Sequence, residues 1–239
     1  MADNISVTIC GDGGCEDSYS VTRTVDGLPY FLSITDTAGQ EEYRGLWTAN
    51  TLKSDAFLLV YDITNPSSLE TLDHFMDLID MEAEQRVEDN QRLRKELGPT
   101  AGPGVGTPPP VKIVAGNKCD LKDGRAVTSR EGLEYARRHG CGFMETSARE
   151  MVNIEETFAH LVRRVVEARR IHLQGPDRPS SRTGQSVHTT ALPPTTTEVT
   201  KRPRARRLFG IGQGRESPET DTDETQGCLF RRLCCVCCG

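Results

Sequence analysis

Two short runs of mainly apolar residues place the tightest limit on how this chain can fold. They are AFLLVYD (Ala56–Asp62) and VKIVAGN (Val111–Asn117), and polar residues bound both of them. Such runs are typical of strands in a parallel sheet, because helices cover both faces of that sheet. The two runs therefore predict the central strands of a parallel sheet.

Four further strands are expected around these two. They lie at Ile5–Cys10, on each side of the Asp26-Gly27 turn in VTRTVDGLPYFLSITD, and at Gly142–Glu145. An Asp-Gly pair between two apolar segments is a strong signal for a hairpin. The chain should therefore form six strands, of which one pair is a hairpin.

Helical patterns alternate with the strands. Apolar residues at helical spacing predict helices at Glu41–Lys53, Ser67–Arg94, Ser129–His139 and Asn153–Leu173. We interpret these apolar stripes as core packing. The alternation predicts an α/β fold with a mostly parallel six-stranded sheet and helices on both faces.

Composition divides the chain into a domain at residues 1–174 and a tail at residues 175–239. The tail is rich in Ser, Thr, Pro and Arg, so it cannot bury enough apolar surface to offset its ordering entropy, and we expect it to be disordered. The Pro/Gly segment Gly98–Pro110 follows a charged stretch. It predicts an exposed insertion at about residues 86–110.

Charge and hydrophobicity suggest a cytosolic protein that does not bind nucleic acid. The net charge is −6, and the basic run Lys201–Arg207 is the one feature that favours nucleic acid or a nuclear signal. No run approaches the ~20 apolar residues of a membrane span, and MADNISVTIC lacks the pattern of a signal peptide. We therefore expect the nine cysteines to be mostly reduced.

Three polar motifs follow expected strands. In DTAGQ (Asp36–Gln40), the acid can hold a magnesium water, the glycine N–H can approach a terminal phosphate, and the glutamine can orient an attacking water. In NKCD (Asn117–Asp120), the carboxylate can accept hydrogen bonds from the N1–H and amino group of guanine, which adenine does not offer. ETSA (Glu145–Ala148) can close over a base. Each motif alone is weak evidence, and NKCD alone is equally explained by a solvated turn.

In their order and spacing, DTAGQEEYRGL, AFLLVYDIT, NKCDL and ETSA make the chain resemble the Ras-type small GTPases from about Glu16 to Leu173. This resemblance implies a P-loop-type nucleotide-binding fold. It also implies a signalling switch that binds GTP or GDP with Mg²⁺ and hydrolyses GTP. Exchange factors, GTPase-activating proteins and effectors would be its partners.

The resemblance also implies roles for single residues. Gln40 would position the hydrolytic water as the catalytic residue, Asp36 would belong to the magnesium site, and Gly39 would contact the γ-phosphate. The second switch would span roughly Thr37–Leu52. The residues implied to select guanine are Asn117, Lys118, Asp120, Ser147 and Ala148.

The phosphate loop is incomplete. GDGGCEDSYS supplies Gly11, Gly13 and Gly14, but Glu16 and Asp17 stand where G-x-x-x-x-G-K-[ST] has its last glycine and its lysine. Substitution would explain this, but a deletion after Cys15 fits better, because too few residues precede the next strand to form a helix. The lysine, the first helix and most of the first switch are then missing together. We expect impaired nucleotide binding and hydrolysis in this chain, which would be a splice form or the product of a faulty gene model.

The C-terminal cysteines predict attachment of lipid. Cys234, Cys235, Cys237 and Cys238 are the candidates, and the nearby basic residues would favour an anionic membrane surface at the cytoplasmic face of the plasma membrane. The ending Val-Cys-Cys-Gly is not a C-a-a-X motif, so palmitoylation and a Rab-like double-cysteine prenylation both stay open. A four-thiolate zinc site is the competing interpretation.

Two hypotheses of different class remain. In the first, the full-length form is a membrane-tethered GTPase switch. In the second, the chain is a non-enzymatic splice form or fragment that keeps the guanine-selecting half and acts as a protein-interaction module.

Overall fold

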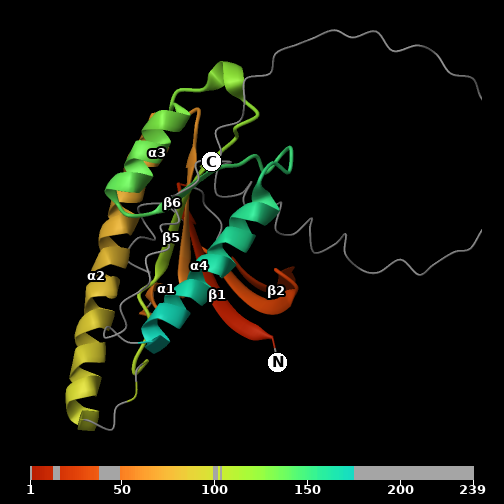
Figure 1. Cartoon of the computed structure of the whole chain (residues 1–239). Helices are drawn as coiled ribbons and strands as arrows, with labels where there is room; N and C mark the ends of the chain where they lie inside the picture. The colour runs from red at the N-terminus through yellow and green to blue at the C-terminus, as the bar shows by residue number, and fades with distance from the viewer. Residues whose placement is uncertain (1, 13–16, 38–48, 99–101, 103, 175–239) are drawn as a thin grey trace, which may run out of the picture.

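The computed structural model describes residues 2–12, 17–37, 49–98, 102 and 104–174 (Figure 1). Its strands are β1 (Asp3–Gly11), β2 (Asp17–Val25), β3 (Leu28–Asp36), β4 (Ala56–Asp62), β5 (Val111–Asn117) and β6 (Gly142–Glu145). Its α-helices are α1 (Ala49–Leu52), α2 (Pro66–Leu97), α3 (Ser129–Arg138) and α4 (Ile154–Gln174). None of the described helices is long and apolar enough to cross a membrane.

The strands form one six-stranded sheet in the order β2-β3-β1-β4-β5-β6. The pair β2–β3 is antiparallel, and every other neighbouring pair is parallel. Asp26 and Gly27 join β2 to β3 with positive φ angles of 51° and 81°, which a tight hairpin turn requires. The predicted α/β fold with a mostly parallel sheet is confirmed.

Helices cover both faces of the sheet. In Figure 1, α2 and α3 lie on one side of the strands and α4 lies on the other. Alternate residues of β4 explain this division: Leu58 and Val60 belong to the cluster that packs against α4, whereas Phe57 and Leu59 belong to the cluster with α2 and α3. The central strand is therefore buried on both faces, as its apolar run predicts.

Two arginines fix α4 across the sheet. The Arg163 guanidinium donates to both carboxylate oxygens of Asp26, each at 3.0 Å, and so holds the helix to the β2–β3 turn. Arg169 donates to Asp3 at 2.9 Å and to Asp55 at 3.0 Å, at the start of β1 and β4. These contacts join elements that are far apart in the sequence, which is why single-segment patterns do not reveal them.

The helix α2 begins and continues for identifiable reasons. Asn65 caps its start by accepting from the Ser67 N–H at 3.2 Å, and proline follows at the first helical position. The helix runs to Leu97, three residues beyond the predicted end. Of the helix expected at Glu41–Lys53, the described part is the short α1, and residues 41–48 lie outside the described residues.

The segment predicted as an exposed insertion begins inside α2 and is partly buried. Arg86 and Asn90 are 5% and 9% exposed. The Asn90 side chain exchanges hydrogen bonds with the backbone N–H and C=O of Thr107, at 2.8 and 2.7 Å. The end of the Pro/Gly segment therefore packs along α2, and the prediction of exposure is wrong for these two residues.

Arg86 joins three parts of the chain. Its guanidinium donates to Glu82 at 2.8 Å, to the carbonyls of Leu52 and Ser54 at 2.9 and 3.1 Å, and to the Pro108 carbonyl at 3.3 Å. A buried arginine with this many acceptors links α2 to the residues before β4 and to those before β5. We infer that it sets where the Pro/Gly segment returns to the sheet.

Replacing Arg86 by methionine should lower the free energy of unfolding by about 3 kcal/mol, because buried acceptors lose a charged donor. Urea denaturation followed by circular dichroism measures this. The matched control is Arg92→Met, since Arg92 pairs with Asp89 at the surface of the same helix; its cost should stay within about 0.5 kcal/mol. Equal losses in the two variants would contradict the role given to Arg86.

Candidate functional site

The carboxyl ends of β4, β5 and β6 lie side by side. In the parallel register, Asp62 at the end of β4 stands opposite Asn117 at the end of β5, and Gly116 stands opposite Glu145 at the end of β6. The loops that leave these strands therefore meet at one edge of the sheet, which is where ligands bind in open α/β sheets. NKCD and ETSA both lie in these loops.

Asn117 connects the two loops. Its side chain is 1% exposed, and Oδ1 accepts from the Ala148 N–H at 3.1 Å and from the Thr146 hydroxyl at 3.5 Å. The Cys119 N–H donates to the Thr146 carbonyl at 3.0 Å. Three of the predicted positions are thus brought together: Asn117 and Ala148 are bonded to each other, and Ser147 lies between Ala148 and Thr146.

Asp120 is held by Ser147. The Ser147 hydroxyl is fully buried, donates to Asp120 Oδ1 at 2.6 Å and accepts from the Glu150 N–H at 3.0 Å. Asp120 itself is half-buried. A carboxylate can accept about four hydrogen bonds, so this contact fixes the direction of Asp120 and leaves capacity for a ligand.

Lys118 forms an ion pair that the sequence analysis did not predict. Its backbone has a positive φ of 63°, and its Nζ pairs with Asp62 Oδ2 at 2.7 Å. Asp62 also accepts from the N–H and hydroxyl of Thr64, at 2.8 and 2.7 Å. Sequence analysis missed Asp62. Its position in the sequence could have pointed to it, because Asp62 ends an apolar strand that pairs with the strand before NKCD.

The same contacts control the ionisation of Asp62. Burial acts to raise the pKa of this carboxyl, but the hydrogen bonds from Lys118 and Thr64 outweigh burial and leave the pKa below its usual value. Asp62 is therefore charged near neutral pH. Its negative charge balances the positive charge of Lys118.

A second ion pair, also missed by sequence analysis, ties the loop after β5 to β6. The Arg125 guanidinium donates to both oxygens of Glu145, at 2.6 and 3.2 Å, and the Ser129 hydroxyl donates to Glu145 at 2.8 Å. Glu145 is the first residue of ETSA. The pair therefore sets the distance between the loops that carry the two guanine motifs.

At the other end of this edge, the last residues of β1 and β3 are buried. Asp36, the last residue of β3, is fully buried, and Thr37 beside it donates to the Ile9 carbonyl through both its N–H and its hydroxyl, at 3.1 and 2.9 Å. Gly11 is the last residue of β1 and is buried. Burial also raises the pKa of the Cys10 thiol. No described group of His, Cys, Asp and Glu side chains could hold a metal ion.

The magnesium role implied for Asp36 stays a prediction. Asp36 is buried at the end of β3, and residues 38–48, which follow close behind it, lie outside the described residues. Between β1 and β2 lie five residues, Asp12–Glu16, of which 13–16 lie outside the described residues. Among the described residues, no helix lies between β1 and β2.

Several predicted site residues cannot be placed. Gly13, Gly14, Gly39 and Gln40 lie outside the described residues, as does most of the second switch. The same holds for the C-terminal cysteines and the tail at 175–239. The roles and the disorder predicted for them stay predictions.

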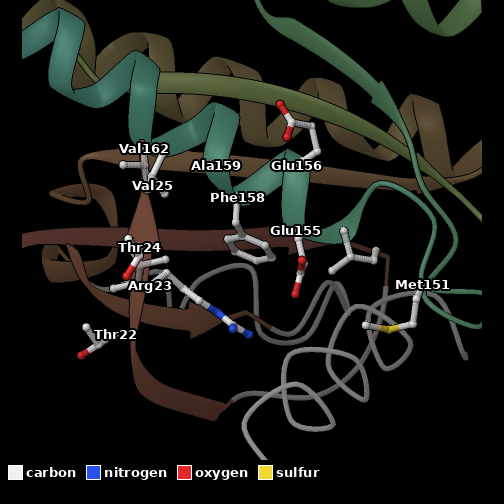
Figure 2. A pocket seen from close by; sticks show the side chains of 12 residues that line it. Thr22, Arg23, Thr24, Val25, Met151, Glu155, Glu156, Phe158, Ala159 and Val162 are labelled. Carbon is white, nitrogen blue, oxygen red and sulfur yellow. The ribbon is translucent and has the colours of Figure 1, made fainter. Parts of the chain in front are cut away.

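A separate hollow lies between β2 and α4. It measures about 480 Å³ and is lined by Thr22–Val25, by Leu32 and by the first turns of α4. Figure 2 shows Phe158 of α4 pointing into it, with Arg23 and Glu155 nearby. None of the predicted guanine-selecting residues lines it, so it is not part of the site at the strand ends.

Comparisons with known proteins agree with this geometry. The model of the Ras family matches residues 7–93 and 104–167. A Ras-like protein from Laccaria bicolor is 37% identical over 154 residues, which cover 64% of this chain and 63% of that protein. The chain thus spans less than two thirds of the length of this relative. The matched ranges include β1 from Val7 onward and the loops after β4, β5 and β6.

The effect of Asp62 on stability should depend on pH. Because the pKa of Asp62 is lower in the folded protein, the stability that Asp62 contributes is present above its unfolded pKa of ~3.9 and is lost as pH falls through the folded value. Urea unfolding of the chain and of Asp62→Asn should therefore differ more at pH 7 than at about pH 3. The exposed Asp77→Asn is the control for removal of an acid from the surface. A difference that is constant or grows toward low pH would contradict the ion pair.

Proposed function

Since the chain belongs to the Ras family of small GTPases, we propose that its strand-end loops recognise guanine nucleotides and that it derives from a membrane-tethered GTP/GDP switch. The observation that carries this proposal is the joint bonding of NKCD and ETSA. Asn117 holds the Ala148 N–H, and Ser147 holds Asp120. The two loops are thus joined by hydrogen bonds within the protein.

The geometry accounts for selection of guanine over adenine. One oxygen of Asp120 accepts from Ser147 and keeps capacity for a further donor, and the second oxygen belongs to the same fixed carboxylate. The N1–H and amino group of guanine are two parallel donors that match a carboxylate, whereas adenine has an acceptor at N1. A half-buried, oriented acceptor favours a ligand that can donate to it over one that cannot.

Hydrolysis of GTP belongs, in this proposal, to a form with a complete phosphate loop. There Gln40 would orient the attacking water, and the added residues would bind Mg²⁺ and the phosphates. The loss of four charge-assisted hydrogen bonds, at ~1.5 kcal/mol each, lowers affinity by about four powers of ten. The chain as written is therefore impaired as a switch.

A non-enzymatic role is the second candidate. It is favoured by the connection of five residues between β1 and β2, which leaves no room for a helix and a first switch. In that role the chain would occupy effectors, exchange factors or GTPase-activating proteins without a nucleotide cycle. The two candidates differ in whether a complete form exists and what it binds.

Insertion of the missing part should restore tight binding. We would insert a segment with a GK[ST] loop, a helix and a first-switch threonine after Cys15, and measure binding of a fluorescent GDP analogue with Mg²⁺. The inserted form should bind at least about 10³-fold more tightly than the chain as written, because its loop adds a lysine and backbone N–H donors. The same insertion with its lysine replaced by alanine is the matched control.

Two results would count against this proposal. Equally tight binding by the chain as written would mean that other groups hold the phosphates. Weak binding by the inserted form, if it is folded, would mean that the strand-end loops do not form the base site.

The tail cysteines are proposed to anchor the protein at the cytoplasmic face of the plasma membrane. Each buried CH₂ of an attached lipid stabilises membrane binding by ~0.8 kcal/mol, and stable anchoring takes two lipids or one lipid with basic residues. Replacement of Cys234, Cys235, Cys237 and Cys238 by serine should move an N-terminally tagged protein from the membrane fraction to the soluble fraction of cells.

The control for this fractionation is Cys119→Ser with Cys141→Ser, which removes two thiols from the described domain. This control should leave the distribution unchanged. An unchanged distribution of the tail variant, or an equal shift in the control, would exclude lipid attachment at the four tail cysteines.

A further inference from the structure

We propose that the hollow between β2 and α4 is a binding site for an anionic amphiphile, a molecule with an apolar chain and one carboxylate, such as a medium-chain fatty acid. The hollow measures about 480 Å³, which lies within the range of about 300–1,000 Å³ that is typical of small-molecule sites. None of the residues that line it belongs to NKCD or ETSA. Binding here would therefore be independent of the guanine site proposed above.

One wall of the hollow is apolar. Leu32 of β3 and the α4 residues Phe158 and Val162 line it, and all three belong to the core cluster on this face of the sheet. Figure 2 shows the Phe158 side chain pointing into the hollow. An apolar chain placed against this wall would leave water, and each methylene that does so tightens binding about fourfold.

A cation stands where the strand pattern predicts an apolar residue. Successive side chains of a strand point to opposite faces of the sheet. In β2, the alternate residues Tyr19, Val21 and Val25 all pack in the cluster on the α4 side. Arg23 belongs to the same alternation, so it faces α4, where it lines the hollow and is half-buried. Figure 2 shows its side chain extending toward the side of the hollow where Glu155 lies.

Arg23 has no partner in the described part of the chain. No hydrogen bond or ion pair joins it to a described residue, whereas the two acids of the hollow are both engaged. Glu156 accepts from Arg163 at 2.9 Å, and Glu155 also has a partner. A half-buried cation without a counter-ion is unfavourable, and the guanidinium presents two parallel N–H donors that match a carboxylate. The charge of the site therefore favours an anion.

The apolar wall and the guanidinium together select the class of ligand. A small inorganic anion would pair with Arg23 but leave the apolar wall in contact with water. A hydrocarbon would cover the wall but leave the guanidinium unpaired. A carboxylate with an apolar chain satisfies both, and its affinity should rise with chain length. Decanoate should bind about tenfold more tightly than octanoate, because two further methylenes leave water.

The test is a nuclear magnetic resonance titration of the ¹⁵N-labelled full chain with acetate, octanoate, decanoate and the uncharged octanol, below the concentrations at which micelles form. Decanoate should shift the amide signals of Thr22–Val25 and Ile154–Val162, with a dissociation constant below about 1 mM. Acetate should leave these signals unchanged at the same concentrations. Octanol should bind about tenfold more weakly than octanoate, because it lacks the charge that pairs with Arg23.

Replacement of the arginine separates its charge from its packing. Arg23→Met keeps an unbranched apolar chain in the hollow but removes the charge. The affinity for octanoate and decanoate should fall at least about tenfold, whereas that for octanol should stay as it is in the parent chain. The matched control is Arg137→Met, because Arg137 is an exposed arginine of α3, on the other face of the sheet. It should leave all of these affinities unchanged.

Filling the hollow should remove binding of every probe. Ala159 lines the hollow from α4, so Ala159→Phe would place a ring in the space of the ligand chain. Shifts from both decanoate and octanol should disappear. Ala168→Phe is the matched control, because Ala168 lies further along the same helix and does not line the hollow. Circular dichroism shows whether each variant is folded.

The outcomes decide the proposal. Shifts that are confined to the hollow, and that depend on Arg23 for the carboxylates but not for octanol, support it. An absence of shifts with decanoate at about 10 mM, or equal losses in Arg23→Met and Arg137→Met, would overturn it. Octanol binding as tight as that of octanoate would also overturn it, because the hollow would then take neutral amphiphiles. If Ala159→Phe does not fold, the ratio of octanoate to octanol affinity in Arg23→Met still decides.

Discussion

Parallel pairing of β4 with β5 is the constraint on which the site depends. The register that places Asp62 opposite Asn117 brings two loops from distant parts of the sequence to one edge. It also puts Lys118, the residue after Asn117, within reach of the Asp62 carboxylate. The pairing itself is stabilised by burial on both faces, since every residue of β4 from Ala56 to Tyr61 is buried. The chemistry at the strand ends is thus a consequence of the core.

The short connection from β1 to β2 separates this edge into two halves with different properties. On one side, the predicted guanine-selecting residues have partners within the loops or, for Lys118, at the end of β4. On the other, β1 turns into β2 after five residues, and the strand ends carry acids. The sheet tolerates this change because β2 pairs with β3 along nine residues and the hairpin is fixed to α4 through Asp26 and Arg163. A fold can therefore persist where part of its site does not.

Much of this fold could be predicted because its signals are local. The bounds of β4, β5 and β6 agree with the sequence prediction, since apolar runs and the polar residues that end them lie within a few positions of each other. The Asp62–Lys118 pair and the buried Arg86 were missed for the opposite reason. From a single segment, a charged residue is expected to be exposed to solvent. Its burial depends on partners from other parts of the sequence, which the sheet and the Pro/Gly segment place beside it.

The same distinction governs what the motifs mean. NKCD and ETSA predict function because their residues satisfy one another: the buried Ser147 hydroxyl donates to Asp120, so a change of Asp120 would leave a buried donor without this acceptor. A glycine-rich phosphate loop is different, since its backbone N–H groups have no partner until an anion binds. Such a loop is stabilised by its ligand and by the helix that follows it, and it loses this stabilisation when either is removed. The base half can therefore outlast the phosphate half in a chain of this family, but the reverse would leave buried polar groups at Asn117 without their partners.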